Sequence, residues 1–263
     1  MKKIVLILLV ALILVPSISF YSALFKDMNE EGVEDTDVND SSSSQSDSTI
    51  KKEIDFSKLS YVAFGDSITY GRDWTHGSVN FGQQMEYPYP KLVGSELGLI
   101  SVDNQGVGSS TLCVNPNGSC SITNIILSYS SDVDIISVTG GVNDYANSSE
   151  LGTIDDMTTD TIYGSLNLIA EYLTSTYDDA FVFFITPYKT TYKSDVLFTM
   201  DHVSNAFIEV GAKWGIPVLD LYNYGQFELE MYSYGSDGVH PSQEFFQEHT
   251  APQIAEFIRE NYK

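Results

Sequence analysis

Short apolar runs alternate with longer amphipathic segments along most of the chain, from Lys58 onward. Five apolar runs have the length of strands, at residues 61–64, 100–104, 133–138, 180–186 and 216–221. The segments with helical spacing lie at residues 90–97, 122–128, 160–177, 194–215 and 242–262. Strands that alternate with helices form parallel sheets with helices on both faces. We therefore predict an α/β fold, a three-layer α/β/α sandwich on a five-stranded parallel sheet.

Apolar residues in the longer segments recur every three or four positions, as in a helix that buries one face. In the segment 194–215 this spacing predicts that four side chains point inward, those of Leu197, Val203, Phe207 and Val210. Ligands of parallel sheets bind at the carboxyl ends of the strands. Residues that carry chemistry are therefore expected directly after the strands.

The first 26 residues combine a basic start, Lys2 and Lys3, with an apolar run from Ile4 to Phe25. This pattern is typical of an export signal, and small residues near Pro16 offer a cleavage site. The run is also long enough to span a bilayer as an uncleaved anchor. Both interpretations place the rest of the chain outside the cell, secreted or tethered to the outer face of the cytoplasmic membrane.

A linker follows this segment. Residues 27–50 contain eight acidic residues, no basic residue and four consecutive serines. So little apolar surface predicts a disordered linker, which we extend to residue 56. The remaining residues, 57–263, suffice for one domain with a sizeable core.

The formal net charge of the chain is -23. Such a charge repels nucleic acid and anionic lipid surfaces, so neither is expected as a partner. Two cysteines, Cys113 and Cys120, enclose a six-residue loop. Because the chain is predicted to be exported, we expect a disulfide between them, with free thiols as the alternative.

The first candidate for chemistry is Ser67, in the sequence Gly65-Asp66-Ser67 directly after the first predicted strand. A serine on a tight turn between a strand and a helix exposes its hydroxyl, and its own N–H can face the oxygen of a bound ester. The same residues also suit an ordinary helix N-terminus, where Asp and Ser are common caps.

The second candidate is the pair Asp237 and His240, separated by two residues near the C-terminus. A carboxylate at this spacing can accept the Nδ1–H of the imidazole, which leaves Nε2 free to take a proton from a serine. An ordinary Asp-Gly turn before a helix that starts at Pro241 would give the same pattern.

Two further segments follow predicted strands. Asn143, after Gly140 and Gly141, offers a side-chain amide to an oxyanion, and the glycine-rich loop 104–111 offers a backbone N–H. Either segment is also compatible with a plain turn. The loop lacks the third glycine of a dinucleotide-binding fingerprint.

Along the chain, these four segments come in the order Ser67, 104–111, Asn143, and Asp237 with His240. In this order they resemble the motifs of the SGNH, or GDSL-type, serine hydrolases, and the resemblance extends over the whole predicted domain. The resemblance implies a flavodoxin-like fold with Ser67 as nucleophile, His240 as base and Asp237 as its partner. It also implies an oxyanion hole formed by the Ser67 N–H, an N–H of the loop 104–111 and Asn143.

One position departs from the family pattern. Five residues after Asn104 the family usually has the oxyanion glycine, whereas this chain has Ser109, preceded by Gly108. A backbone N–H does not require glycine, so Ser109 is the expected donor, with Gly108 as the fallback.

No group of His, Asp and Glu residues has the spacing of metal ligands, and we expect neither a metal nor another cofactor. His76, His202 and His249 are interpreted as ordinary surface or core residues. Aromatic residues flank the proposed blocks and could hold sugar rings or acyl chains, or simply pack: Tyr70, Trp74, Tyr87, Tyr89, Tyr232 and Tyr234.

Together the residues predict a serine esterase that hydrolyses short, acetyl-like esters, with extracellular or cell-wall carbohydrate as a candidate substrate. The alternatives are a lipase or lysophospholipase, a thioesterase of the same family, and a non-catalytic surface binding module. The oligomeric state and the identity of the ester stay open at this level.

Overall fold

The computed structural model describes residues 54–114, 120–147, 149–191, 197–225 and 237–263. The predicted signal or anchor, residues 1–26, lies outside these ranges, as does the predicted linker up to residue 53. Tyr232 and Tyr234 lie outside them too. Within the described parts, no helix has both the length and the apolar character that crossing a membrane requires.

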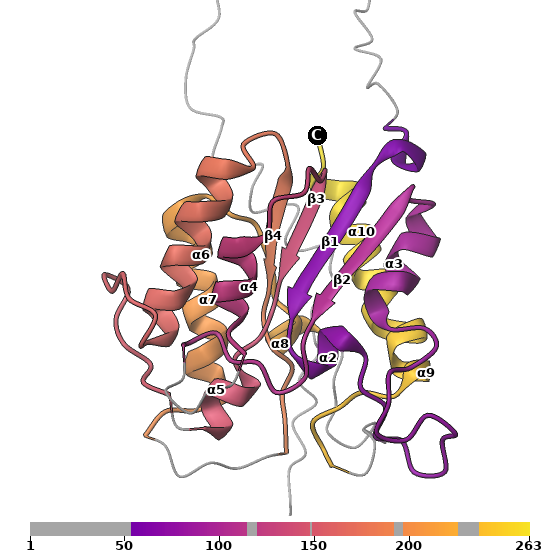
Figure 1. The fold of residues 1–263 in the computed structure, drawn as a ribbon, viewed down its shortest axis with the longest axis horizontal. Coiled ribbons are helices and arrows are strands. Elements are labelled where there is room, and N and C mark those ends of the chain that lie inside the picture. The colour runs from indigo at the N-terminus through magenta and orange to yellow at the C-terminus, as the bar shows by residue number, and fades with distance from the viewer. Residues whose placement is uncertain (1–53, 115–119, 148, 192–196, 226–236) are drawn as a thin grey trace, which may run out of the picture. The chain divides into compact units, whose positions relative to one another are not determined.

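A five-stranded parallel sheet forms the centre of the domain (Figure 1). Its strands are β1 (Ser60–Gly65), β2 (Ser101–Gly106), β3 (Ile135–Val138), β4 (Phe181–Ile185) and β5 (Val218–Leu219). They lie in the order β2-β1-β3-β4-β5, and every neighbouring pair is parallel. The predicted five-stranded parallel sheet is therefore confirmed.

Helices cover the sheet on both sides (Figure 1). One side carries α3 (Tyr89–Leu97) and α10 (Ala251–Asn261), which pack against each other. The other side carries α4 (Ile122–Ser128), α6 (Ile162–Thr176) and α7 (Met200–Trp214). This is the predicted three-layer sandwich.

Three short helices follow strands, and none of them was assigned from the helical spacing of apolar residues. They are α2 (Ser67–Tyr70), α5 (Val142–Ala146) and α8 (Leu221–Tyr224), after β1, β3 and β5. Four or five residues are too few to show a helical period. All three lie at the carboxyl end of the sheet, where the candidate residues were expected (Figure 1).

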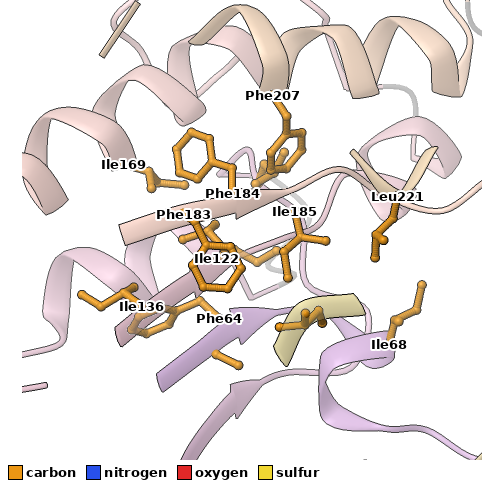
Figure 2. Close-up of a cluster of buried hydrophobic side chains, with 14 of the residues drawn as sticks. Phe64, Ile68, Ile122, Ile136, Ile169, Phe183, Phe184, Ile185, Phe207 and Leu221 are labelled. Atoms are coloured by element: carbon orange, nitrogen blue, oxygen red, sulfur yellow. The ribbon is translucent and has the colours of Figure 1, made fainter. Parts of the chain in front are cut away.

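The core is aromatic and aliphatic and lies between the sheet and its helices. Phe184 of β4 meets Phe207 of α7 edge to face, with ring centroids 5.8 Å apart. Figure 2 shows Ile169 of α6 beside Phe184, on the same side of the strand as Phe207. Both Phe184 and Phe207 are completely buried, so this contact fixes α7 on the sheet.

The predicted helix 194–215 begins later than expected. In the structure α7 starts at Met200, because Thr199 and His202 form a capping box that fixes the N-terminus of the helix there. Leu197 precedes this cap and is fully exposed, so the prediction that it points inward is wrong. Val203, Phe207 and Val210 are buried as predicted.

The predicted C-terminal helix 242–262 is not one regular helix. It consists of α9 (Gln243–Phe245), the π-turn η4 (Phe246–Thr250) and α10. Pro252 has no N–H to donate to the preceding turn, and the N–H of Ala251 instead reaches back to the carbonyl of Phe246. The wider turn accommodates the proline without ending the helix.

The predicted disulfide is absent, since Cys113 and Cys120 are both free. Cys113 is buried beside the carboxylate of Asp144, whereas Cys120 is exposed. Burial, followed by the Asp144 charge, raises the pKa of the Cys113 thiol far above its usual value. The two thiols therefore occupy different environments, and residues 115–119 of the loop between them lie outside the described ranges.

The revised start of α7 predicts unequal effects of two truncations within the same segment. Phe207→Ala should lower the free energy of unfolding by about 3–5 kcal/mol, because it leaves a cavity against Phe184. Leu197→Ala should change it by less than about 0.5 kcal/mol, as expected for an exposed side chain. Denaturant unfolding of both variants measures this, and comparable losses would contradict the assigned helix start.

Candidate active site

Ser67 is the first residue of α2, two residues after β1 ends at Gly65. Asp66 caps this helix, because its Oδ1 accepts the N–H of Ile68 at 2.9 Å. Gly65 is needed for the close turn, since a Cβ there would lie 2.0 Å from Thr69 Oγ1. The sharp, capped turn fixes the position of the serine side chain.

The structure brings Ser67, His240 and Asp237 together in one hydrogen-bonded chain. His240 Nε2 lies 2.8 Å from Ser67 Oγ, and His240 Nδ1 lies 2.6 Å from Asp237 Oδ2. Ser67 and His240 are 173 positions apart in the sequence, so only the fold can produce this contact. The order nucleophile, base and carboxylate is the geometry that serine hydrolases use.

The carboxylate of Asp237 is held by its own loop. Its Oδ1 accepts the N–H groups of Val239 at 2.9 Å and of His240 at 3.0 Å. Partial burial raises the pKa of Asp237, but the hydrogen bonds from the His240 side chain and these two N–H groups outweigh it and hold the pKa below its usual value. Asp237 is therefore an anion at neutral pH, oriented toward the imidazole.

The loop that carries Asp237 and His240 is tied to the segment after β4. The carbonyl of Gly238 accepts the Thr191 N–H at 3.2 Å and the Thr190 hydroxyl at 3.1 Å. Gly238 has a φ of +71°, and a Cβ at this position would lie 1.8 Å from Thr191 Oγ1. Glycine is therefore required at this position for two reasons: the left-handed backbone conformation and the close approach of Thr191.

The glycine-rich loop predicted at residues 104–111 lies against α2. Asn104 Nδ2 donates to the carbonyl of Thr69 at 2.9 Å, and the N–H of Val107 donates to the carbonyl of Gly65 at 3.0 Å. A Cβ on Gly106 would lie 2.1 Å from the Tyr70 nitrogen. The loop is therefore in direct contact with the turn that carries Ser67.

Ser109 has a φ of +63° and is the one non-glycine residue with positive φ in the described parts of the chain. A left-handed backbone explains why the resembling family usually has glycine here. Asn143 Nδ2 donates to the carbonyl of Ser110 at 2.8 Å, so the amide and the loop lie side by side. The second N–H of that amide is available for another acceptor.

Asp144 anchors this arrangement, although sequence reasoning gave it no role. Its carboxylate accepts the N–H groups of Leu112 at 2.7 Å and Cys113 at 2.9 Å. Burial is the main reason that its pKa is raised, and these two hydrogen bonds oppose the shift. Its position beside Asn143 was visible in the sequence, but its partners, more than thirty residues away, were not.

A second acidic side chain, that of Asp66 directly before Ser67, is also buried. Burial raises the pKa of Asp66 from 3.8 to about 6, although the Ile68 N–H and the nearby His240 oppose the shift. Asp66 holds the backbone of α2 through the Ile68 N–H, so it positions the turn that carries Ser67.

Aromatic residues border the imidazole on one side. The Trp74 ring lies 6.0 Å from that of His240, and Phe81 packs edge to face on Trp74 at 5.2 Å. Both belong to residues 71–85, here called the strap, which folds back on itself through an antiparallel bridge between Arg72 and Gln84. Four of the six aromatic residues singled out in the sequence lie in the described ranges, and among these four Trp74 is the one whose ring lies beside that of His240.

The other three histidines have separate surroundings. His202 caps α7, His249 packs on Phe245 at 5.0 Å, and His76 stacks on Phe81 at 6.0 Å. In the described ranges no three His, Cys, Asp or Glu side chains gather as metal ligands would.

A hollow of about 390 Å³ lies at the opposite, amino edge of the sheet. Its lining includes Ser60, Asp132, Asp134 and Asp178, and contains no histidine, cysteine or basic residue. Ser60 donates both its N–H and its hydroxyl to Asp134 there. The hollow therefore lacks the histidine that a serine triad needs. Ser67, His240 and Asp237, hydrogen-bonded to one another at the carboxyl edge, form the candidate active site.

The hydrogen-bonded Ser67, His240 and Asp237 lie at the carboxyl edge of a parallel α/β sheet, in the geometry that serine hydrolases use. The sequence matches the model of the GDSL-like lipase/acylhydrolase family over residues 63–247. The chain therefore belongs to this family and is a hydrolase of ester bonds. A comparison with curated protein sequences gives no match.

Solved structures share the fold. A protein from Lactobacillus plantarum is 20% identical, with a TM-score of 0.67 over 80% of this chain and 100% of the other. A possible lipase from Chitinophaga pinensis is 24% identical, with a TM-score of 0.63 over 77% and 98%. A carbohydrate acetylesterase family member from Sinorhizobium meliloti is 14% identical, with a TM-score of 0.56 over 77% and 98%.

The burial of Asp66 predicts a pH-dependent stability difference between the protein and its Asp66→Asn variant, in which Asn keeps the helix cap. Between pH 4 and 6 folded Asp66 keeps a proton that the unfolded chain releases, so rising pH favours the unfolded state. The variant does not lose stability in this way. Its free energy of unfolding, relative to that of the parent, should therefore rise by up to about 3 kcal/mol between pH 4 and pH 7. Unfolding titrations from pH 4 to 7 measure the difference, and a constant difference would contradict the assignment.

Proposed function

We propose that Ser67 is the nucleophile of an esterase, with His240 as general base and Asp237 as the group that orients it. The observation that carries this proposal is the chain of two hydrogen bonds, 2.8 Å from Ser67 Oγ to His240 Nε2 and 2.6 Å from His240 Nδ1 to Asp237 Oδ2. A buried structural histidine has no need of a hydroxyl on one ring nitrogen and a carboxylate on the other.

The reaction proceeds in two steps. His240 Nε2 takes the proton of Ser67 as its oxygen attacks the ester carbonyl, and the imidazolium then protonates the leaving alcohol. Water, deprotonated by the same nitrogen, hydrolyses the acyl-enzyme. Asp237 holds the proton-bearing Nδ1 and stabilises the imidazolium, which its ionised state at neutral pH supports.

The oxyanion hole is assigned to the Ser67 N–H, the Ser109 N–H and the Asn143 amide, with Gly108 as the fallback donor. The contacts of the loop with Gly65 and of Asn143 with Ser110 support this, because they join all three segments at one point. Loss of one such donor costs roughly 10²–10³ in rate in enzymes of this kind.

We propose short acyl groups on extracellular or cell-wall carbohydrate as the substrate. The strap supports a sugar, since Trp74 lies beside His240 and Phe81 is partly exposed next to it. Aromatic faces suit the apolar faces of sugar rings. The similarity in fold to the carbohydrate acetylesterase family member from Sinorhizobium meliloti is compatible with this choice.

Export is part of the same proposal. The apolar segment 1–26 and the acidic linker would deliver the domain to the outside of the cell, either released or held at the membrane. No metal or other cofactor is needed for the chemistry proposed, because nucleophile, base and oxyanion donors all come from the chain.

Hydrolysis of p-nitrophenyl esters from acetate to palmitate tests the proposal. Activity should fall steeply beyond butyrate, and Ser67→Ala should lose it by on the order of 10⁶-fold, since the triad acts as a unit. Asp237→Asn should lose roughly 10⁴-fold through the wrong imidazole tautomer. Ser95→Ala, which removes an exposed hydroxyl on α3, is the matched control.

Each other outcome points to a different function. A preference for long acyl chains would favour a lipase or lysophospholipase, and a preference for the matching thioesters would favour a thioesterase. Folded protein that hydrolyses no ester would favour a non-catalytic binding module. Acetate activity that survives Ser67→Ala would contradict the assignment of the nucleophile.

A further inference from the structure

Arg72 lies between the nucleophile and the strap. Its N–H donates to the carbonyl of Ser67 at 2.9 Å, directly after α2. Its guanidinium is held from two directions, because Nη1 donates to the carbonyl of Gly82 at 2.7 Å and Cζ lies 5.3 Å from the centre of the Tyr70 ring. The side chain is partly buried, so these contacts fix the position of its charge.

The guanidinium also lies close to the glycine-rich loop 104–111. A Cβ on Gly108 would lie 2.8 Å from Arg72 Nη2, so glycine at this position gives the cation room beside the backbone. Gly108 and Ser109 are the two residues from which the loop's oxyanion donor is assigned. A fixed positive charge therefore lies next to the place where the ester carbonyl is expected.

This charge has no carboxylate partner in the described part of the chain. Lys58 and Arg259 each form an ion pair there with a carboxylate within 4 Å, and Arg72 does not. The acidic residues nearest to Arg72 in the sequence are engaged elsewhere, since Asp66 caps α2 and Asp73 accepts the Thr75 N–H and the Ser78 hydroxyl.

An unpaired, partly buried arginine is unexpected in a chain with 36 acidic and 13 basic residues. A guanidinium held in place can bind an anionic group through charge-assisted hydrogen bonds, which are stronger than hydrogen bonds between neutral groups. One of the five guanidinium N–H donors is accounted for by Gly82, and the planar fork suits the paired oxygens of a carboxylate or phosphate.

We propose that Arg72 determines substrate specificity by binding an anionic group, a carboxylate or a phosphate, that the substrate carries close to the scissile ester. The inference rests on the proposed esterase function and narrows its substrate to acylated molecules with a negative charge beside the acyl group. Within the carbohydrate class, sugar acids and sugar phosphates carry such a charge.

Four acetate esters of similar size test this assignment on the full-length protein. Phenyl acetate is neutral, 3-acetoxybenzoate carries a carboxylate, 3-acetoxyphenyl phosphate carries a phosphate, and 3-acetoxyphenyltrimethylammonium carries a positive charge. For each ester, kcat/KM of a variant is divided by that of the parent, which removes differences between leaving groups. The variants are Arg72→Gln, Arg72→Lys and, as a charge-matched control at the opposite end of β1, Lys58→Gln.

In Arg72→Gln this ratio should be about tenfold lower for one or both anionic esters than for phenyl acetate, mainly through KM. For the cationic ester the ratio should be higher than for phenyl acetate. In Arg72→Lys the ratio for the anionic esters should lie closer to the ratio for phenyl acetate than it does in Arg72→Gln. In Lys58→Gln the ratio should be the same for all four esters. The carboxylate and phosphate arms identify which anion is bound. Ratios within one variant do not depend on how much of the protein is folded.

Equal ratios for all four esters in Arg72→Gln would overturn the inference. Arg72 would then only stabilise the strap, and the proposed esterase function would be unaffected. A parent protein that hydrolyses none of the esters would overturn the proposed function together with this inference.

Discussion

The hydrogen bond between Ser67 and His240 depends on nearly every other feature of the fold, because it joins positions 173 residues apart. Parallel strands bring their carboxyl ends to one edge, where β1 delivers Ser67 at the start of α2. The loop that carries His240 reaches the same edge through the contacts of Gly238 with Thr190 and Thr191, directly after β4. A sheet with another strand order would separate these two groups.

Three carboxylates near this edge differ in their environment, and their environments set their roles. Asp237 is partly exposed and accepts hydrogen bonds that keep it ionised beside the imidazole. Asp66 and Asp144 are buried, their pKa values are raised, and both accept backbone N–H groups. The two buried residues therefore hold in place the turn at Ser67 and the segment at Leu112 and Cys113. Their burial costs desolvation free energy that a purely apolar core would avoid.

Much of this architecture could be predicted from the sequence, because strand and helix periods and the strand-end motifs are local patterns. The short apolar runs predicted all five strands. The motifs predicted that Ser67, Asn143, Asp237 and His240 lie at the carboxyl edge of the sheet. Contacts between distant segments left no local signal, so the support of Gly238 by Thr191 was missed. Spacing alone also could not show that the cap at Thr199 starts α7 after Leu197, or that Cys113 turns toward Asp144.

The most direct test of the central claim is labelling of the protein with a fluorophosphonate, followed by mass spectrometry of its peptides. A serine activated by His240 should react once per chain, on the peptide that contains Ser67, and His240→Ala should slow the reaction by several orders of magnitude. A label on another serine, or equal labelling of the His240→Ala variant, would contradict the account.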